Sequence, residues 1–183
     1  NFAHAVEYAA DISRGHAVRV QQVDSPPMRG SLAHELLSRA LTSSEIRELD
    51  TDAATSLAVA ELFDREAPRL AAVLYLPGAD RSRESIRDVI INSAVRLMKE
   101  VRRRGGPVVT ETRFSKEAFG TTVAGRVDLL LENPPLVVDL KLSGTKYKRE
   151  ELESGSAYQL AVYANLVGTP NRKTNPAVAY FIL

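Results

Sequence analysis

The sequence predicts an α/β protein in which helices flank a mixed β-sheet and a helical region precedes that sheet. Apolar residues recur at helical spacing up to about residue 104, and from residue 107 onward they alternate as in strands. The last part of the chain has strand–helix–strand order, which favours a parallel crossover. We expect a single domain over residues 1–183, with a helical part at about 30–106 and a sheet with its helix at about 107–183.

The helical part is predicted from leucine spacing and helix-breaking residues. Segment 25–30 (SPPMRG) is expected to interrupt regular structure, because it contains two prolines and a glycine. Helices are expected over 31–41, from Ser43 or Ser44, from Thr51 to about Glu66, and over 82–104. The run Arg102–Arg104 is interpreted as a solvated helix end that complements the helix dipole, with DNA contact as the alternative.

Strands are predicted at 107–114, 122–132 and 135–143, followed by a helix over 149–168 and a strand at 176–183. The first two strands are joined by a loop that contains Gly120, and the next two by Asn133-Pro134. The core candidates of the long helix are Leu152, Tyr158, Val162 and Leu166. Residues 1–24 show no clear pattern.

Composition excludes several classes of site. The chain has 24 Lys and Arg against 23 Asp and Glu, so any nucleic-acid footprint must be local. It has no cysteine, which excludes disulfides, cysteine zinc sites and an iron–sulfur cluster in this segment. No apolar run is long enough to cross a membrane and no signal peptide opens the chain, so a cytoplasmic protein is expected. Because the first residue is Asn1, we expect a piece of a larger protein.

The segment VVDLKLS (137–143) places an acid and a base in an apolar strand. Asp139 and Lys141 are two residues apart and therefore share a strand face with Val137. Isolated charges are costly to bury, so these two groups need partners. A cross-strand Asp–Lys pair is one explanation, and an active site is the other.

The preceding strand contains a second acid that favours the active-site interpretation. Alternation puts Asp128 on one face with Arg126 and Leu130, opposite Val127, Leu129 and Leu131. Antiparallel pairing then brings Asp128 beside Asp139. Two neighbouring carboxylates remain ionised when a cation lies between them, and oxygen ligands select Mg²⁺ or Mn²⁺. The ammonium of Lys141 would neutralise phosphate charge or act on an attacking water.

Three polar residues outside these strands are further candidates. Gln159 and Tyr163 lie four apart on one face of the following helix. His34 lies in a leucine-rich helix, and an imidazole beside two carboxylates favours Mn²⁺. Each of the three also has an ordinary structural explanation, as a core aromatic, a polar edge or a structural histidine.

Read in order, these residues form G-x-x-x-H (30–34), G-R-V-D (125–128), D-L-K (139–141) and Q-L-x-x-Y (159–163). This pattern resembles the RecB-like branch of the PD-(D/E)xK nuclease superfamily, which includes the nuclease domains of RecB and AddB and the CRISPR adaptation nucleases. The resemblance covers about residues 30–165 and implies a restriction-endonuclease-like fold.

The resemblance also implies residue roles. Asp128, Asp139, the Leu140 carbonyl and His34 would hold Mg²⁺ or Mn²⁺, Lys141 would act on the nucleophilic water, and Gln159 and Tyr163 would support Lys141 or the scissile phosphate. Glu111 is either a further member of the acidic cluster or an exposed hairpin residue, and the second interpretation is preferred. The helical insert at about 35–106 contains no recognisable motif.

The function that this resemblance implies is metal-dependent cleavage of single- or double-stranded DNA. The resemblance implies a nuclease module of a DNA repair, recombination or defence enzyme, with exonuclease activity and linkage to a helicase or ATPase as further expectations. Two alternatives remain open: a non-catalytic DNA-binding or scaffolding module that keeps the fold, and RNA cleavage by the same chemistry.

Overall fold

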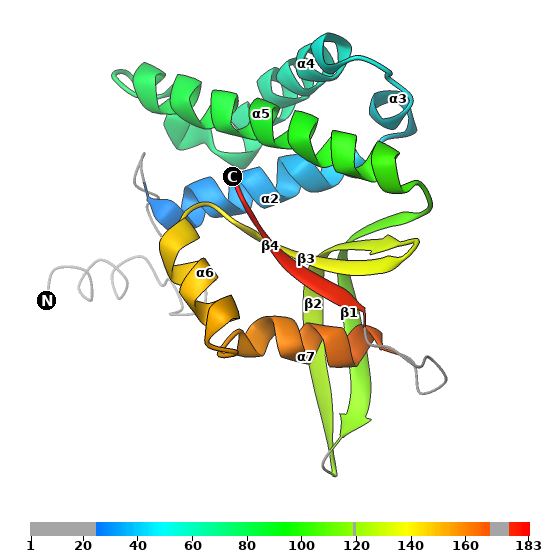
Figure 1. The fold of residues 1–183 in the computed structure, drawn as a ribbon. Helices are drawn as coiled ribbons and strands as arrows, with labels where there is room; N and C mark the ends of the chain where they lie inside the picture. Colours follow the sequence, from blue (N-terminus) through cyan, green and yellow to red (C-terminus); the bar gives the residue numbers. More distant parts are fainter. Residues whose placement is uncertain (1–24, 119, 169–175) are drawn as a thin grey trace, which may run out of the picture.

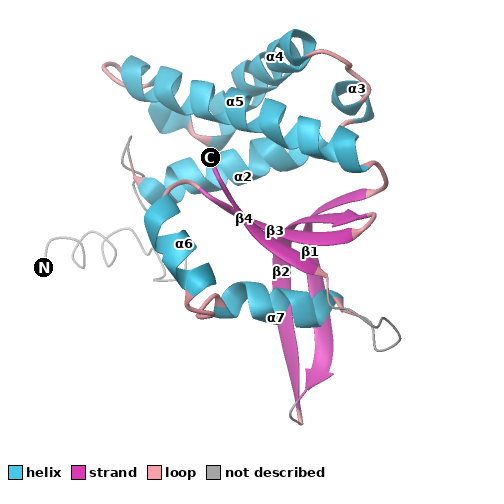
Figure 2. Ribbon diagram, viewed as in Figure 1, coloured by secondary structure: helices cyan, strands magenta, loops and turns pink. Residues whose placement is uncertain are grey.

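The computed structural model describes residues 25–118, 120–168 and 176–183, so the unassigned segment 1–24 lies outside the described residues. The helical part precedes a sheet whose last two strands are separated by two further helices (Figures 1 and 2). Its elements are α2 (Pro26–Thr42), α3 (Ser44–Arg47), α4 (Asp52–Leu70), the 3₁₀ turn η2 (Ala72–Tyr75) and α5 (Asp80–Arg104). The sheet region comprises β1 (Val108–Ala118), β2 (Thr121–Glu132), β3 (Pro135–Lys141), α6 (Thr145–Glu153), α7 (Tyr158–Val167) and β4 (Ala177–Ile182).

The four strands form one mixed sheet in the order β1-β2-β3-β4. The β1–β2 and β2–β3 pairs are antiparallel, whereas β3 and β4 are parallel and are connected through α6 and α7. The predicted fold class, a mixed sheet flanked by helices and preceded by a helical region, is therefore confirmed. None of the helices in the described ranges combines the length and apolar character needed to span a bilayer.

Two hydrophobic clusters hold helices against the two faces of the sheet. The larger cluster joins α2, α4 and α5 to one face of β2 and β3. The predicted leucines of α2 belong to it and are all buried: Leu32, Leu36, Leu37 and Leu41. The smaller cluster joins α7 to the other face through Val127, Leu130 and Val137. The sheet is thus a middle layer between two sets of helices (Figure 2).

Two helix boundaries differ from the predictions because proline is tolerated near helix ends. Helix α2 begins at Pro26, within the segment expected to be irregular, and Ser25 precedes it as the N-cap residue. The first-turn N–H groups have no partner inside a helix, so a proline there loses nothing. Helix α4 continues through Pro68 to Leu70. Near the C-terminal end one missing hydrogen bond is offset by the burial of Phe63 and Ala67.

The predicted helix over 149–168 is wrong as a single element. The chain forms α6 and α7 separated by a turn, in which Gly155 has a φ of 70°. The interruption changes the helical phase, so Leu160 is buried while Leu152, Tyr158 and Val162 are exposed. Of the four predicted core residues in this region, Leu166 alone is buried.

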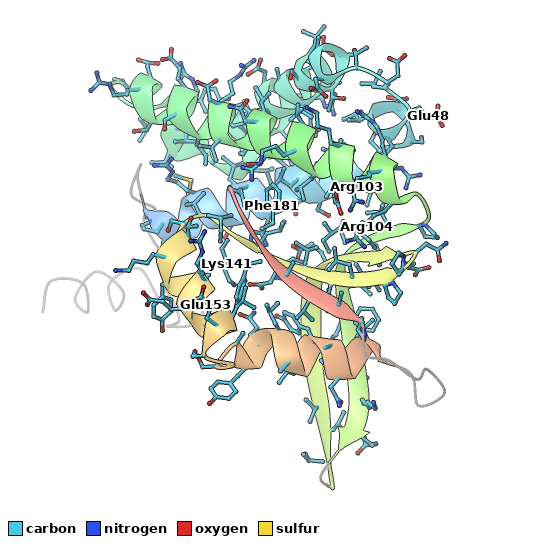
Figure 3. The ribbon with its side chains drawn as sticks, in the orientation of Figure 1. Glu48, Arg103, Arg104, Lys141, Glu153 and Phe181 are labelled. Atoms are coloured by element: carbon cyan, nitrogen blue, oxygen red, sulfur yellow. The ribbon has the colours of Figure 1, made fainter. Side chains whose placement is uncertain are left out.

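The arginine run at the end of α5 is engaged within the protein. Arg103 and Arg104 both pair with Glu100, at 2.7 and 2.5 Å, and Arg102 donates to the Thr55 hydroxyl at 2.7 Å. Hydrogen bonds from Arg103 and then Arg104 lower the pKa of Glu100 to about 2. Both labelled arginines lie where α5 leads into β1 (Figure 3). These contacts fit the interpretation as a helix end.

Candidate metal centre

The candidate site lies where β2 and β3 separate. Their backbone pairing ends at Leu129 and Val138, whereas β3 continues beside β4 as far as Lys141. Beyond that point, Oδ2 of Asp128 accepts the backbone N–H of Leu140 at 2.8 Å. The carboxylate therefore replaces a backbone hydrogen bond, which fixes Asp128 at the place where the two strands diverge.

Glu111 causes a local irregularity in the β1–β2 hairpin. The register pairs Thr110 with Leu129 and Thr112 with Val127, but Glu111 and Asp128 between them are not a regular pair. Glu111 has a φ of 48°, which is unusual for a residue with a Cβ atom. The side chains of β2 change sides of the sheet at this point. Val127 and Leu130 are three residues apart, yet both pack in the cluster with α7.

The predicted alternation, with Val127 and Leu130 on opposite faces, is therefore wrong. The change of face on β2 occurs at Asp128, which lies opposite Glu111 where the regular β1–β2 pairing is interrupted. The irregularity turns the carboxylates of Glu111 and Asp128 toward α2 and its histidine. A backbone outlier of this kind is typical of functional sites.

His34 of α2 completes this cluster. Its Nε2 donates to the Leu140 carbonyl at 3.1 Å, and its Nδ1 lies 3.3 Å from Glu111 Oε1 and 3.8 Å from Asp128 Oδ1. One ligand atom each from His34, Glu111 and Asp128 lies within 4.8 Å of the others. One imidazole and two carboxylates are a donor set that suits Mn²⁺ and, through its oxygens, Mg²⁺.

Asp139 lies beside this cluster in a more enclosed position. Its side chain is 1% exposed, and Lys141 Nζ lies 2.7 Å from its Oδ2. This contact is a close ion pair, and among the described residues no further group donates a hydrogen bond to the buried oxygen. Burial raises the pKa of Asp139, Lys141 lowers it, and Asp128 raises it again. A buried carboxylate needs a positive partner, and Lys141 supplies one beside the candidate ligands.

Lys141 is connected to the two polar residues of α7. Its Nζ donates to Gln159 Oε1 at 3.4 Å, and Gln159 Nε2 donates to Tyr163 Oη at 2.9 Å. Figure 3 shows Lys141 on the inner side of α6, near the end of β3. The chain Asp139–Lys141–Gln159–Tyr163 thus runs from the sheet to α7.

Gly125 provides room for this connection. A Cβ atom at this position would lie 3.0 Å from Tyr163 Cε1 and 3.0 Å from Leu166 Cδ1. Such contacts are shorter than packed carbon atoms prefer, so any larger residue would displace the tyrosine ring. The glycine of the G-R-V-D segment is therefore explained by the close approach of α7 to β2.

The structure brings all the predicted site residues into one region, in two connected groups. His34, Asp128 and the Leu140 backbone lie on the α2 side, and Asp139, Lys141, Gln159 and Tyr163 extend toward α7. Glu111 was expected to be an exposed hairpin residue. It is 22% exposed and belongs to the first group. The hairpin register could have identified it, since a turn around Gly120 places position 111 opposite Asp128.

A polar cluster at the point where strands of a mixed sheet diverge defines a candidate metal centre on an α/β scaffold. The family described as the PD-(D/E)XK nuclease superfamily matches residues 1–183. The chain belongs to this superfamily, whose members are generally nucleases that use divalent metals. Neither a curated protein nor a solved structure gives a significant match.

Two substitutions of Glu111 separate its backbone from its carboxylate. Alanine keeps the Cβ atom that makes the φ of 48° unfavourable, whereas glycine adopts the same φ without that cost, so Glu111→Gly should be more stable than Glu111→Ala by about 1 kcal/mol. Both should bind Mn²⁺ at least about tenfold more weakly than the wild type. Urea unfolding and calorimetric titration with Mn²⁺ measure the two effects. Equal stability of the two variants would show that position 111 is not strained.

Proposed function

We propose that this protein is a Mg²⁺- or Mn²⁺-dependent deoxyribonuclease that hydrolyses phosphodiester bonds. The observation that supports this most strongly is the cluster of His34, Glu111 and Asp128 beside the buried Asp139, whose Oδ2 lies 2.7 Å from the Lys141 ammonium. Three converging ligand side chains and a nearby ammonium match what metal-assisted phosphodiester hydrolysis requires. Membership of a nuclease superfamily supports the same reaction class.

One group of residues would bind the metal ion. His34, Glu111 and Asp128 would hold a divalent cation, with Asp139 and the Leu140 carbonyl as further oxygen ligands. The cation, when bound, supplies positive charge for the phosphate and acidity for a water molecule. Asp128 also orients the Leu140 peptide through its 2.8 Å hydrogen bond. Its position is therefore set by the protein before any ion is present.

Lys141 would act at the phosphate or on the attacking water. Its ammonium is held between Asp139 Oδ2 at 2.7 Å and Gln159 Oε1 at 3.4 Å. The Gln159–Tyr163 hydrogen bond limits the positions that this amide can adopt. A positive charge fixed before the reaction stabilises developing negative charge without a reorganisation cost. Gln159 and Tyr163 would therefore be positioning residues for Lys141.

The order of the four sequence motifs supports assignment to the RecB/AddB-like branch. We therefore place the chain as a single nuclease domain within a DNA repair, recombination or defence enzyme, working with a helicase or ATPase domain or subunit. Its substrate would be single- or double-stranded DNA.

Asp139→Asn tests the proposed activity. Linear duplex DNA, single-stranded DNA and matched RNA are incubated with wild-type protein in Mg²⁺, in Mn²⁺ and in EDTA. We expect metal-dependent cleavage of DNA, and a loss of at least about a hundredfold in Asp139→Asn. The amide keeps the shape of the side chain but leaves the Lys141 ammonium without its carboxylate, so urea unfolding is measured to check that the variant is folded.

Asp52→Asn is the matched control, since this aspartate is 51% exposed and pairs with Lys99 at the surface. It should cleave DNA as the wild type does. Cleavage by Asp139→Asn at the wild-type rate, or no cleavage by the wild type in either metal, would contradict the proposal. DNA binding without cleavage would favour the non-catalytic binding module, and preferential cleavage of RNA would reassign the substrate.

A further inference from the structure

Two arginines face each other across the β1–β2 hairpin next to the metal centre. Arg113 and Arg126 are directly paired in the antiparallel register, two residues beyond Glu111 and Asp128 on each strand. Like charges that are directly opposite destabilise a sheet. Both side chains are exposed, with Arg126 at 70%. No carboxylate of the described chain lies within ion-pair distance of Arg113. A bound anion would offset this repulsion.

Two hollows in the surface meet at Arg126. One, of about 390 Å³, is lined by His34, Glu111 and Arg126 among others, and so opens onto the metal centre. The other, of about 310 Å³, is lined by Arg113, Gly125 and Arg126. Arg126 lines both hollows, so it links the one beside the metal centre to the one beside the arginine pair. The hairpin that carries the pair extends beyond the rest of the sheet (Figure 1).

We propose that Arg113 and Arg126 form a clamp for the phosphate next to the scissile one in a single strand of DNA. The inference rests on the proposed function, because it takes the metal centre as the place of cleavage. Two residues along a strand span about 6.6 Å, which is comparable to the spacing of successive phosphates in an extended nucleic-acid strand. Guanidinium groups bind phosphate oxygens in pairs of parallel hydrogen bonds, so two facing arginines suit one phosphate.

Arg126 also links the clamp to the metal centre. Its Nε lies 3.1 Å from Glu111 Oε2, so it neutralises a carboxylate of the candidate ligand set. A cation bound at Glu111 takes over this neutralisation and frees the guanidinium for phosphate. Loading of the metal centre and binding of DNA should therefore support each other.

The test measures binding with cleavage disabled by Asp139→Asn in every protein. A fluorescein-labelled single-stranded oligonucleotide is titrated by anisotropy in Mn²⁺ over a range of NaCl concentrations. We expect Arg113→Gln and Arg126→Gln each to weaken binding roughly tenfold. Because both arginines neutralise one phosphate, the double variant Arg113→Gln/Arg126→Gln should lower the slope of log K against log salt by about 0.7. Arg69→Gln, on α4 and 68% exposed, is the matched control and should change neither quantity.

A second arm locates the phosphate. A series of oligonucleotides is prepared, each with one phosphate replaced by a neutral methylphosphonate. Replacement at one position should weaken binding by the protein that keeps both arginines. The same position should have no effect in the double variant Arg113→Gln/Arg126→Gln. Calorimetry with Mn²⁺ alone should show tighter binding by Arg126→Gln and unchanged binding by Arg113→Gln, because Arg126 alone competes for Glu111.

The outcomes separate this inference from the proposed function. If both arginine variants bind DNA as Arg69→Gln does, or if Arg126→Gln alters Mn²⁺ affinity alone, the clamp is wrong. Absence of measurable DNA binding by the parent protein also overturns it. If the clamp binds one phosphate as expected but the wild type cleaves nothing in either metal, the proposed function fails and the arginine pair stands as a phosphate-binding site alone.

Discussion

Replacing Lys141 with alanine is expected to lower the rate of DNA cleavage by roughly a hundredfold to ten-thousandfold, the range for a positioned group that acts on a proton or charge. The ammonium lies 2.7 Å from Asp139 and 3.4 Å from Gln159, and alanine removes the charge from this position. A steady-state assay of DNA cleavage in Mn²⁺ measures the loss. Lys99→Ala, at an exposed surface pair with Asp52, is the matched control and should retain the wild-type rate.

The same substitution should change how stability depends on pH. Burial raises the pKa of Asp139 above its ordinary value of 3.8, and Lys141 partly opposes this. Between the ordinary and the raised pKa, the folded protein holds a proton that the unfolded chain has released. The free energy of unfolding therefore falls as pH rises through this window. Without Lys141 the pKa of Asp139 rises further, so the fall continues to higher pH.

Urea unfolding from mildly acidic to mildly alkaline pH measures this shift. The difference in stability between wild type and Lys141→Ala should be smallest at the acidic end and grow as pH rises. A constant difference across the whole series would mean that Asp139 does not titrate with a raised pKa, and the ion pair would then have no role in its ionisation.

Substitutions of Asp128 should separate its structural role from its role in metal binding. Asp128→Asn keeps an oxygen that accepts the Leu140 N–H, whereas Asp128→Ala leaves that donor without its 2.8 Å partner. An unsatisfied N–H in this half-buried place costs about 1–3 kcal/mol, so the alanine variant should be less stable than the asparagine variant by that amount. Both should lose Mn²⁺ binding and cleavage, because neither supplies a carboxylate.

Urea unfolding of the two variants, together with Mn²⁺ titration, provides the measurement. Unfolding at the same urea concentration would show that water replaces the carboxylate at the Leu140 N–H. Retention of wild-type Mn²⁺ affinity by Asp128→Asn would remove Asp128 from the ligand set.

The fold could be predicted from the sequence wherever one face of an element is buried. In α5 the apolar residues Ile86, Ile90, Leu97 and Val101 repeat at helical spacing, and all four are buried. In β3, Val137 and Val138 pack in different clusters, as alternation requires. Burial of one face leaves a period in the sequence, and that period identifies the element.

The errors in the fold occur where a single residue changes the local geometry. Gly155 interrupts a segment whose apolar residues suggest one helix, and no periodic signal marks this turn. Pro26 begins a helix although proline usually interrupts one. Glu111 leaves the extended conformation, which reverses the faces of both hairpin strands near Asp128. Such changes depend on tertiary contacts that no local pattern contains.

In the candidate site, too, residues grouped by local spacing could be predicted, whereas residues joined by tertiary contacts could not. Asp139 and Lys141 share a strand face, and Gln159 and Tyr163 share a helix face, so local spacing alone groups each pair. The approach of His34 to Glu111 joins residues 77 positions apart. It depends on how α2 packs against the sheet. A hairpin register is needed to bring Glu111 beside Asp128, which explains why its place in the cluster was not preferred.

The backbone of Leu140 makes the geometry of the candidate metal centre sensitive to packing in the interior. The side chain of Leu140 is 2% exposed in the larger hydrophobic cluster, while its N–H and its carbonyl hold Asp128 and His34. Packing in the interior and alignment of the candidate ligands therefore share one residue. A displacement of Leu140 that the fold tolerates would already separate Asp128 from His34, so we expect substitutions in this part of the interior to weaken the candidate metal centre before they unfold the protein.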